Sequence, residues 1–177
     1  AKVSTLLDGN GTNFEEYKQS IIDGSSQMKT SVSDYSEALY EALSSGIDQA
    51  NATEFTNKAI MLAKGGFTSA SNAVDVLTTA INAYNLSAKD TTHISDLLIA
   101  TQDAGKTTVD ELSSSMGKVI PVAKAAGVNL EQLSAGYALL TKNGIATAEA
   151  GTYMKSMFQE LSKSGTDTDK ALRELST

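Results

Sequence analysis

The sequence predicts an all-α fold built from helical hairpins, on three observations. The chain has one proline in 177 residues, its apolar residues recur at spacings of three and four, and a motif repeats about every 39 residues. Proline interrupts helices, the spacing places residues on one helical face, and repeats of this length are typical of stacked helix pairs. We therefore expect a compact to slightly elongated bundle or a short solenoid.

Glycines mark the repeat. Gly66, Gly105 and Gly144 follow one another at equal intervals (105 − 66 = 39; 144 − 105 = 39). Candidate caps and apolar residues keep the same interval, namely Asn51, Asp90 and Asn129, and Phe55, Ile94 and Leu133. Each unit consists of a cap, a helix, a glycine turn, a second cap and a longer helix. We expect each glycine to cap the first helix of an antiparallel pair.

Apolar stripes place the elements in order. Six stripes have the helical period, and they begin at Phe14, Val32, Ala70, Val109, Leu130 and Ala150. The segments after the candidate caps Asn51 and Asp90 complete the hairpins. The expected helices cover 12–23, 33–45, 51–64, 69–84, 90–103, 108–126, 129–142 and 147–163, with a weaker one near 167–175. Pro121 has no amide hydrogen, so we expect it to kink the helix over 108–126.

Capping boxes support these starts. A capping box joins a Ser, Thr, Asp or Asn to a Glu or Gln three residues later. Pairs with this or nearly this pattern are Thr12 with Glu15, Asp34 with Glu37, Asn51 with Glu54, Thr108 with Glu111 and Asn129 with Gln132. Together with the repeat, they divide the chain into an N-terminal extension with one short helix, residues 1–30, and an all-α core domain, residues 31–177.

Composition restricts the possible functions. The formal net charge of −7 argues against binding phosphate backbones, which requires clustered Lys and Arg. Without cysteine the chain has no disulfide, no thiolate zinc site and no thiol nucleophile. No apolar run approaches the roughly 20 residues of a membrane helix, so a soluble segment without membrane contact is expected. The chain begins with Ala1 and ends in Ser and Thr, which indicates a piece of a longer protein.

Motifs for nucleotide or calcium binding are incomplete. Gly105-Lys106-Thr107 resembles the end of a phosphate-binding loop, but Ala100 stands where the motif needs glycine, and a helix precedes it where a strand is required. A helix turn explains the string better. The segment from Asp8 to Thr12 resembles a calcium loop, but the glycine and the bidentate glutamate are missing.

Signals for hydrolysis are also weak. Ser115 with Lys118 and Ser26 with Lys29 have the Ser-x-x-Lys spacing of some acyl-transfer enzymes, without companion motifs. His93 is the only histidine, so a metal site lacks its usual ligands. Glycosylation sequons stand at Asn10, Asn51 and Asn85. We expect no catalytic, cofactor-binding or metal-binding residue and no cofactor.

Four strings carry a resemblance to a known family. They are Ser36-Glu-Ala-Leu-Tyr-Glu-Ala-Leu-Ser-Ser-Gly-Ile-Asp48, Ala80-Ile-Asn-Ala-Tyr-Asn-Leu-Ser87, Val119-Ile-Pro-Val-Ala-Lys-Ala-Ala-Gly-Val128, and Ala138-Leu-Leu-Thr-Lys-Asn-Gly-Ile145 leading to Gly151. In this order they resemble the core domain of tail tape measure proteins of bacteriophages and prophages, over residues 35–175. Residues 1–30 show no comparable string.

The resemblance implies a structural role and no enzyme activity. A tape measure protein is made in the bacterial cytoplasm, occupies the tail tube lumen of the virion, sets tail length during assembly and leaves during genome delivery. The resemblance implies four kinds of partner: other copies of the protein, the tail tube protein, tail assembly chaperones and tail-tip proteins. The alternative is an α-solenoid adaptor that presents a groove to a peptide or protein, and a helical lytic enzyme is a more distant one.

Overall fold

The computed structural model describes residues 14–164, which form α-helices and one 3-10 turn, with no strand among them. The elements are α1 (Phe14–Gln27), α2 (Val32–Ser44), α3 (Gln49–Gly65), α4 (Ala70–Tyr84), η2 (Ala88–Asp90), α5 (Thr91–Ala104), α6 (Val109–Ala125), α7 (Leu130–Lys142) and α8 (Thr147–Ser164). The predicted all-α class is confirmed. The helix expected near 167–175 lies outside the described residues.

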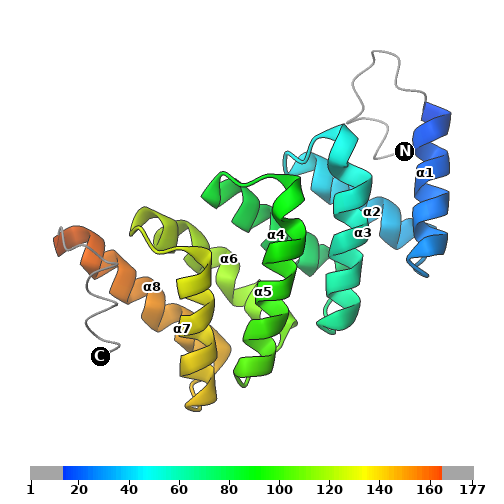
Figure 1. The fold of residues 1–177 in the computed structure, drawn as a ribbon. Helices are drawn as coiled ribbons and strands as arrows, with labels where there is room; N and C mark the ends of the chain where they lie inside the picture. The colour runs from blue at the N-terminus through cyan, green and yellow to red at the C-terminus, as the bar shows by residue number, and fades with distance from the viewer. Residues whose placement is uncertain (1–13, 165–177) are drawn as a thin grey trace.

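The helices form two layers (Figure 1). In the first layer α3, α5 and α7 lie side by side, each in contact with the next. In the second layer α4 contacts α2 and α6, and α6 in turn contacts α8. Helix α1 packs against α2 and α3 at the N-terminal end of the array. Each hairpin therefore takes one helix from each layer, which is the arrangement of a short solenoid.

A continuous apolar core fills the space between the layers. Its largest fully buried side chains include Tyr35, Phe55, Leu77, Met116 and Tyr137, which come from both layers. Burying one such side chain stabilises the fold by about 1.5–3 kcal/mol. Because every hairpin contributes to the same core, neighbouring hairpins depend on one another for their stability.

The spacing of equivalent buried residues shows that the repeat interval is not 39 residues throughout. Leu77 of α4 and Met116 of α6 are 39 residues apart (116 − 77 = 39) and both are fully buried. From α6 to α8 the interval is 38, since Met116 corresponds to the buried Met154 (154 − 116 = 38). The glycines keep 39 throughout, so the turn before α8 absorbs the difference.

The three marker glycines do not share one conformation. Only Gly144 is left-handed, with φ +93°, and it directly follows Asn143, the C-cap of α7. Gly66 and Gly105 have φ of −96° and −103°. In the first of these turns the left-handed residue is Phe67, with φ 53°. Gly66 and Gly105 are nevertheless the C-cap residues of α3 and α5, so the expected glycine caps are confirmed in these two units without a left-handed conformation.

Close packing explains the other two glycines. A Cβ on Gly66 would lie 2.5 Å from Cβ of Val109, at the start of α6. A Cβ on Gly105 would lie closer than 3.0 Å to Oγ1 of Thr141 on α7, and 3.2 Å from Cα of Ala138. Both glycines sit where one hairpin meets the next, so their missing side chains permit close approach of the two hairpins.

Two of the predicted capping boxes are confirmed. Thr108 with Glu111 caps α6, and Asn129 with Gln132 caps α7, each with both hydrogen bonds of the box. Pro121 lies inside α6, and the helix continues past it to Ala125. The kink expected at this proline stays a prediction.

Other caps differ from the prediction. Ser31, not Asp34, caps α2, because its hydroxyl oxygen accepts a hydrogen bond from the amide of Asp34. Asp48, not Asn51, caps α3 by accepting from the amide of Ala50. In each case an equally good capping residue stands three residues before the predicted one (34 − 31 = 3; 51 − 48 = 3), and the helices begin at Val32 and Gln49. The pair Thr12 and Glu15 extends outside the described residues.

Candidate functional site: grooves and hairpin contacts

The loop that resembled a phosphate-binding loop is a contact between hairpins. The amide of Lys106 donates a hydrogen bond to Oγ1 of Thr141 on α7, at 3.2 Å. The hydroxyl of Thr107 lies 2.8 Å from that of Thr147, and Thr147 donates to the carboxylate of Glu111 at 3.1 Å. The amide and hydroxyl groups that would contact a phosphate are thus used to join α5–α6 to α7–α8.

The serine and lysine pairs are also structural. Ser115 Oγ lies 2.7 Å from the phenol oxygen of Tyr137, in a hydrogen bond between α6 and α7, and Lys118 is exposed on α6. Ser26 lies near the end of α1, and Lys29 follows in the turn with φ 48°. Neither pair is joined by a hydrogen bond that the structure shows.

His93 forms an exposed pair between two units. Its Nε2 lies 2.9 Å from the carboxylate of Glu131 at the start of α7. The hydrogen bond with His93 lowers the pKa of Glu131. Among residues 14–164 no three His, Cys, Asp or Glu side chains gather as a metal site would require. Of the sequons, Asn51 lies in α3 and Asn85 is the left-handed C-cap of α4, whereas Asn10 and the Asp8–Thr12 loop lie outside the described residues.

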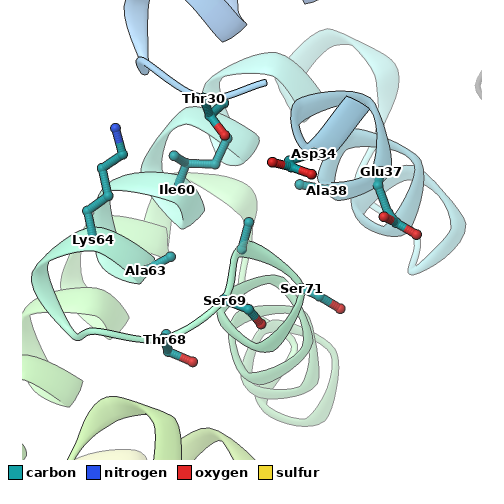
Figure 2. A pocket seen from close by; sticks show the side chains of 11 residues that line it. Thr30, Asp34, Glu37, Ala38, Ile60, Ala63, Lys64, Thr68, Ser69 and Ser71 are labelled. Carbon is teal, nitrogen blue, oxygen red and sulfur yellow. The ribbon is translucent and has the colours of Figure 1, made fainter. Parts of the chain in front are cut away.

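One groove opens where α2, α3 and α4 meet (Figure 2). Asp34 and Glu37 of α2 line one side, and Thr68, Ser69 and Ser71 line the other at the start of α4. The groove therefore combines carboxylates with small hydroxyl side chains around an N-terminal helix end.

A second groove runs between α6 and α8. It is lined by Ser114, Ser115 and Lys118 from α6 and by Gly151 and Lys155 from α8, among others. A Cβ on Gly151 would lie 2.6 Å from the phenol oxygen of Tyr137 and closer still to Ser115. Glycine therefore lets α6 and α8 approach closely at the floor of this groove.

Polar contacts join the hairpins at the starts of the second-layer helices. Asp110 at the start of α6 accepts hydrogen bonds from Thr68 Oγ1 at 2.6 Å and from Asn72 Nδ2 at 2.9 Å, both in the preceding unit. These two hydrogen bonds lower the pKa of Asp110, because they stabilise its charged form. Thr107, the equivalent of Thr68 one unit further on (107 − 68 = 39), contacts the hydroxyl of Thr147 at the start of α8.

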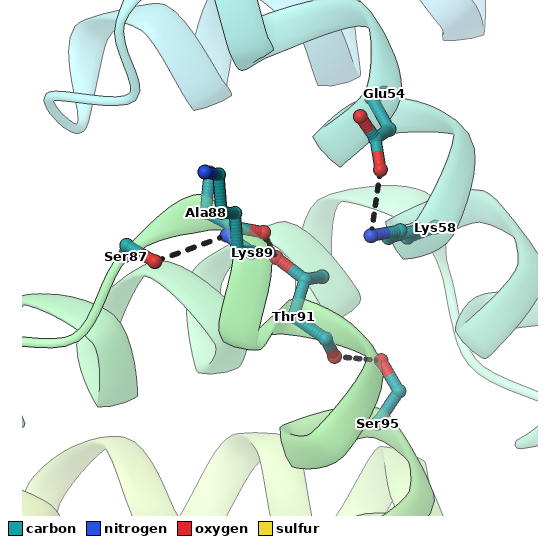
Figure 3. Close-up of polar contacts among 7 residues, drawn as sticks. All are labelled: Glu54, Lys58, Ser87, Ala88, Lys89, Thr91 and Ser95. Atoms are coloured by element: carbon teal, nitrogen blue, oxygen red, sulfur yellow. Dashed lines mark hydrogen bonds and ion pairs between the residues drawn. The ribbon is translucent and has the colours of Figure 1, made fainter.

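The 3-10 turn η2 completes the connection between two units (Figure 3). Ser87 and Asp90 form a capping box around it. The hydroxyl of Thr91 donates to the carbonyl of Ala88 at 2.6 Å. Nearby on α3, Lys58 pairs with Glu54 at 2.8 Å. Asp90, expected as the side-chain cap of α5, makes no such bond to α5 because its carboxylate is held by Ser87.

Tyrosines add long-range contacts that sequence reasoning missed. Tyr35 donates to Asn57 Oδ1 at 2.7 Å, and Tyr84 donates to the carbonyl of Val128 at 2.9 Å. Burial raises the pKa of Tyr35, of Tyr84 and of Tyr137 to about 12. Their place in the apolar stripes was visible in the sequence, but their partners lie 22 to 44 residues away.

These features define a helical-repeat protein. Its described polar side chains cap and brace single helices, and a smaller set of them joins the hairpins. The family described as phage-related minor tail protein matches residues 18–177. The chain belongs to this family, and it is a component of the phage tail. The match includes most of α1, so it extends further toward the N-terminus than the strings from which the resemblance was inferred.

Two relatives are called tape measure proteins, which confirms the resemblance. The probable tape measure protein of Clostridium phage phiCD119 is 34% identical over 175 residues, covering 97% of this chain and 18% of the relative. The tape measure protein of Pneumococcus phage Dp-1 is 24% identical over 111 residues, covering 63% of this chain and 10% of the relative. The chain thus spans less than a fifth of the length of either. No solved structure matches it at a significant level.

Proposed function

We propose that this chain is a folded docking segment of a tape measure protein, acting in tail assembly and length determination and in genome delivery. The observation that carries the proposal is the two-layered array of hairpins with one shared core. Within the longer protein, residues 31–177 act as the docking core and residues 1–30 as an extension. The absence of catalytic and cofactor-binding residues stays a prediction.

The fold is poorly suited to measuring length. A repeat of 39 residues would extend about 58 Å as a continuous helix, because each residue rises 1.5 Å. As a hairpin beside its neighbours it advances by about 10 Å, the spacing of packed helices. The array therefore adds roughly a sixth of the length per residue, so the length-setting stretches lie elsewhere in the protein.

Opening the hairpins into a long helix would be costly. Leu77, Met116 and Tyr137 have no exposed surface, and each would enter water if its unit separated from the next. At about 1.5–3 kcal/mol for each large side chain, exposing the core would exceed the 5–15 kcal/mol that stabilises a typical domain. The segment is therefore expected to act in its folded form.

The proposed setting follows from the family. The segment would be made in the bacterial host cytoplasm and act in the lumen of the tail tube. Its partners would be other copies of the protein, the tail tube protein, tail assembly chaperones and tail-tip proteins. It would make no contact with nucleic acid or membrane. Among residues 14–164 no helix is both long and apolar enough to cross a membrane.

A substitution in the core tests whether the segment acts as a folded docking element or as part of the length-measuring stretch. Met116→Asp places an unpaired charge in the core without changing the number of residues, so it should unfold the array. The matched control is Ala125→Asp, an exposed position at the end of the same helix and outside the groove between α6 and α8. In the phage that encodes the protein, electron microscopy should show few or no normal tails for Met116→Asp and normal tails for the control.

Deletions test the same point. Removing continuous helical sequence outside the core should shorten tails by about 1.5 Å per residue. Removing residues 31–177 should instead abolish normal tails or genome delivery. Infectious particles with normal tails for Met116→Asp, or tails that shorten in proportion to the residues removed from the core, would show that the segment does not act as a folded docking element.

The solenoid arrangement also supports the second candidate, an adaptor that binds a peptide or protein. The groove between α6 and α8 is the observation in its favour. Substituting Lys155 with Glu in this groove would discriminate between the two. An adaptor should lose its partner in co-purification while tail assembly proceeds, whereas a docking segment that used this groove should lose assembly as well.

A further inference from the structure

The exposed face of the first layer carries an apolar row that repeats with the hairpins. Met61 on α3 and Leu139 on α7 are each 62% exposed, although both are large and apolar. Ala100 on α5 is also exposed and stands midway between them in the repeat (100 − 61 = 39; 139 − 100 = 39). These three residues, one per unit, are called here the apolar row. Because α3, α5 and α7 lie side by side (Figure 1), the row crosses all three helices.

A row of charges runs beside the apolar row. Lys64, Asp103 and Lys142 each follow a member of the apolar row by three residues, and all three are exposed. Residues three apart are neighbours on a helix surface, so each charge lies one turn beyond its apolar neighbour. The charges alternate in sign from unit to unit. Lys64 also donates to the carbonyl of Met28 and, at 3.4 Å, to that of Lys29, which leaves one of its three ammonium hydrogens.

The charge order argues against a second copy of the chain on this face. If two copies met face to face with Ala100 on the twofold axis, Lys64 would approach Lys142 of the other copy. Asp103 would likewise approach its own counterpart. Like charges facing each other are destabilising, so two copies in full overlap repel. A copy shifted by one unit would pair Lys64 with Asp103, but it would leave one member of the apolar row uncovered in each copy.

The spacing of the row fits an α-helix laid across the layer. Packed helices lie about 8–10 Å apart, and this distance sets the separation of equivalent residues in neighbouring units. Two turns of an α-helix advance about 11 Å. A crossing helix with an apolar residue every second turn would therefore place successive residues over Met61, Ala100 and Leu139.

We propose that this face binds an amphipathic α-helix of a partner segment, with one apolar residue every two turns beside an acidic, basic and acidic residue in that order. The apolar row buries the apolar residues of the partner, and the charged row sets its direction and register. The inference goes beyond the proposed function and rests only on the fold.

A designed peptide can test the proposal with the whole chain. The probe is a helical peptide with leucine at every seventh position and Glu, Lys and Glu beside successive leucines. Fluorescence anisotropy should show saturable binding to the chain, and the double substitution Met61→Lys with Leu139→Lys should weaken it at least tenfold. The matched control is Tyr153→Lys, since Tyr153 is 51% exposed on α8, outside the row. Circular dichroism should show all variants folded.

The row of charges allows a second test with a different peptide. A peptide with the order Lys, Glu and Lys should bind the unchanged chain more weakly, and should regain affinity for the triple variant Lys64→Glu, Asp103→Lys and Lys142→Glu. The proposal is overturned if no peptide binds, if the double substitution binds as well as the control, or if charge order has no effect. It is also overturned if sedimentation shows a dimer that the double substitution dissolves.

Discussion

Substituting Gly105 with alanine tests the explanation of the repeat glycines. With φ −103° the backbone at Gly105 suits any residue, so the added methyl group meets only tertiary contacts. Its Cβ would lie within 3.0 Å of Thr141 Oγ1, 3.1 Å from the carbonyl oxygen of Thr101 and 3.2 Å from Cα of Ala138. Two of these neighbours are backbone atoms, so the contact cannot be relieved by a side-chain rotation alone.

The magnitude follows from two opposing effects. Overpacking of this kind costs about 1–3 kcal/mol, whereas replacing glycine by alanine in an allowed conformation stabilises by about 0.4–1 kcal/mol. The free energy of unfolding should therefore fall by about 1–2 kcal/mol. For a domain of this size the midpoint of thermal unfolding should decrease by about 2–4 °C per kcal/mol. Urea unfolding followed by circular dichroism measures the change.

A second substitution identifies the cause. Thr141→Ala removes Oγ1 of Thr141, the atom nearest to the added Cβ. The double variant, Gly105→Ala with Thr141→Ala, should therefore be more stable by at least about 0.5 kcal/mol than the sum of the two single effects predicts. The control is Gly46→Ala, where φ is +96° and no atom lies within 4 Å of the added Cβ. Its loss should come from backbone strain alone and should not depend on Thr141. Stability of Gly105→Ala equal to the unchanged chain, or strict additivity with Thr141→Ala, would refute the reasoning.

Four further outcomes are expected. Ser134→Ala should raise stability by up to about 1 kcal/mol in urea unfolding, because its buried hydroxyl has no hydrogen-bond partner among the described residues. Phe67→Gly should raise the midpoint of thermal unfolding, because the side chain of Phe67 is 88% exposed and its backbone is in the left-handed region, which glycine adopts without strain. A lower midpoint would contradict this prediction. In the folded protein the pKa values of Tyr35 and Tyr137 are about 12, against an ordinary value of 10. Their contribution to stability is therefore complete below pH 10 and is lost as the pH rises toward 12. Circular dichroism should show this loss of stability at alkaline pH, and a flat profile would contradict the prediction. Calorimetry should detect no ATP binding, and Lys106→Ala should change stability by less than about 0.5 kcal/mol.

The sequence alone determined the helices and their pairing. Stripes such as that of Leu77 and Ile81 on α4 have a period that only a helix satisfies, and local capping residues such as Thr108 and Asn129 mark where helices begin. These signals depend on neighbours within about four residues, so they can be read without the fold. Where two capping residues stand one turn apart, as Asp48 and Asn51 do, the local signal leaves the choice open.

The departure of the loop at Lys106 from a phosphate-binding motif was also visible locally. The loop at Lys106 lacked a glycine and a strand, and the structure shows its amide bonded to Thr141. The grooves were not predictable, because each is lined by residues from helices far apart in the sequence. The same holds for the hydrogen bond between Asp110 and Thr68, which are 42 residues apart.

Tertiary structure alone decided what the repeated glycines do. Gly66, Gly105 and Gly144 look equivalent in the sequence, yet only Gly144 is left-handed. The other two have no side chain because Val109 and Thr141 of the next unit occupy that space. A glycine in the sequence indicates a position where a side chain does not fit, either because of the backbone dihedral angle or because a neighbouring residue fills the space. Which of the two causes applies depends on how the hairpins pack, and that packing is set by contacts between residues roughly one repeat apart.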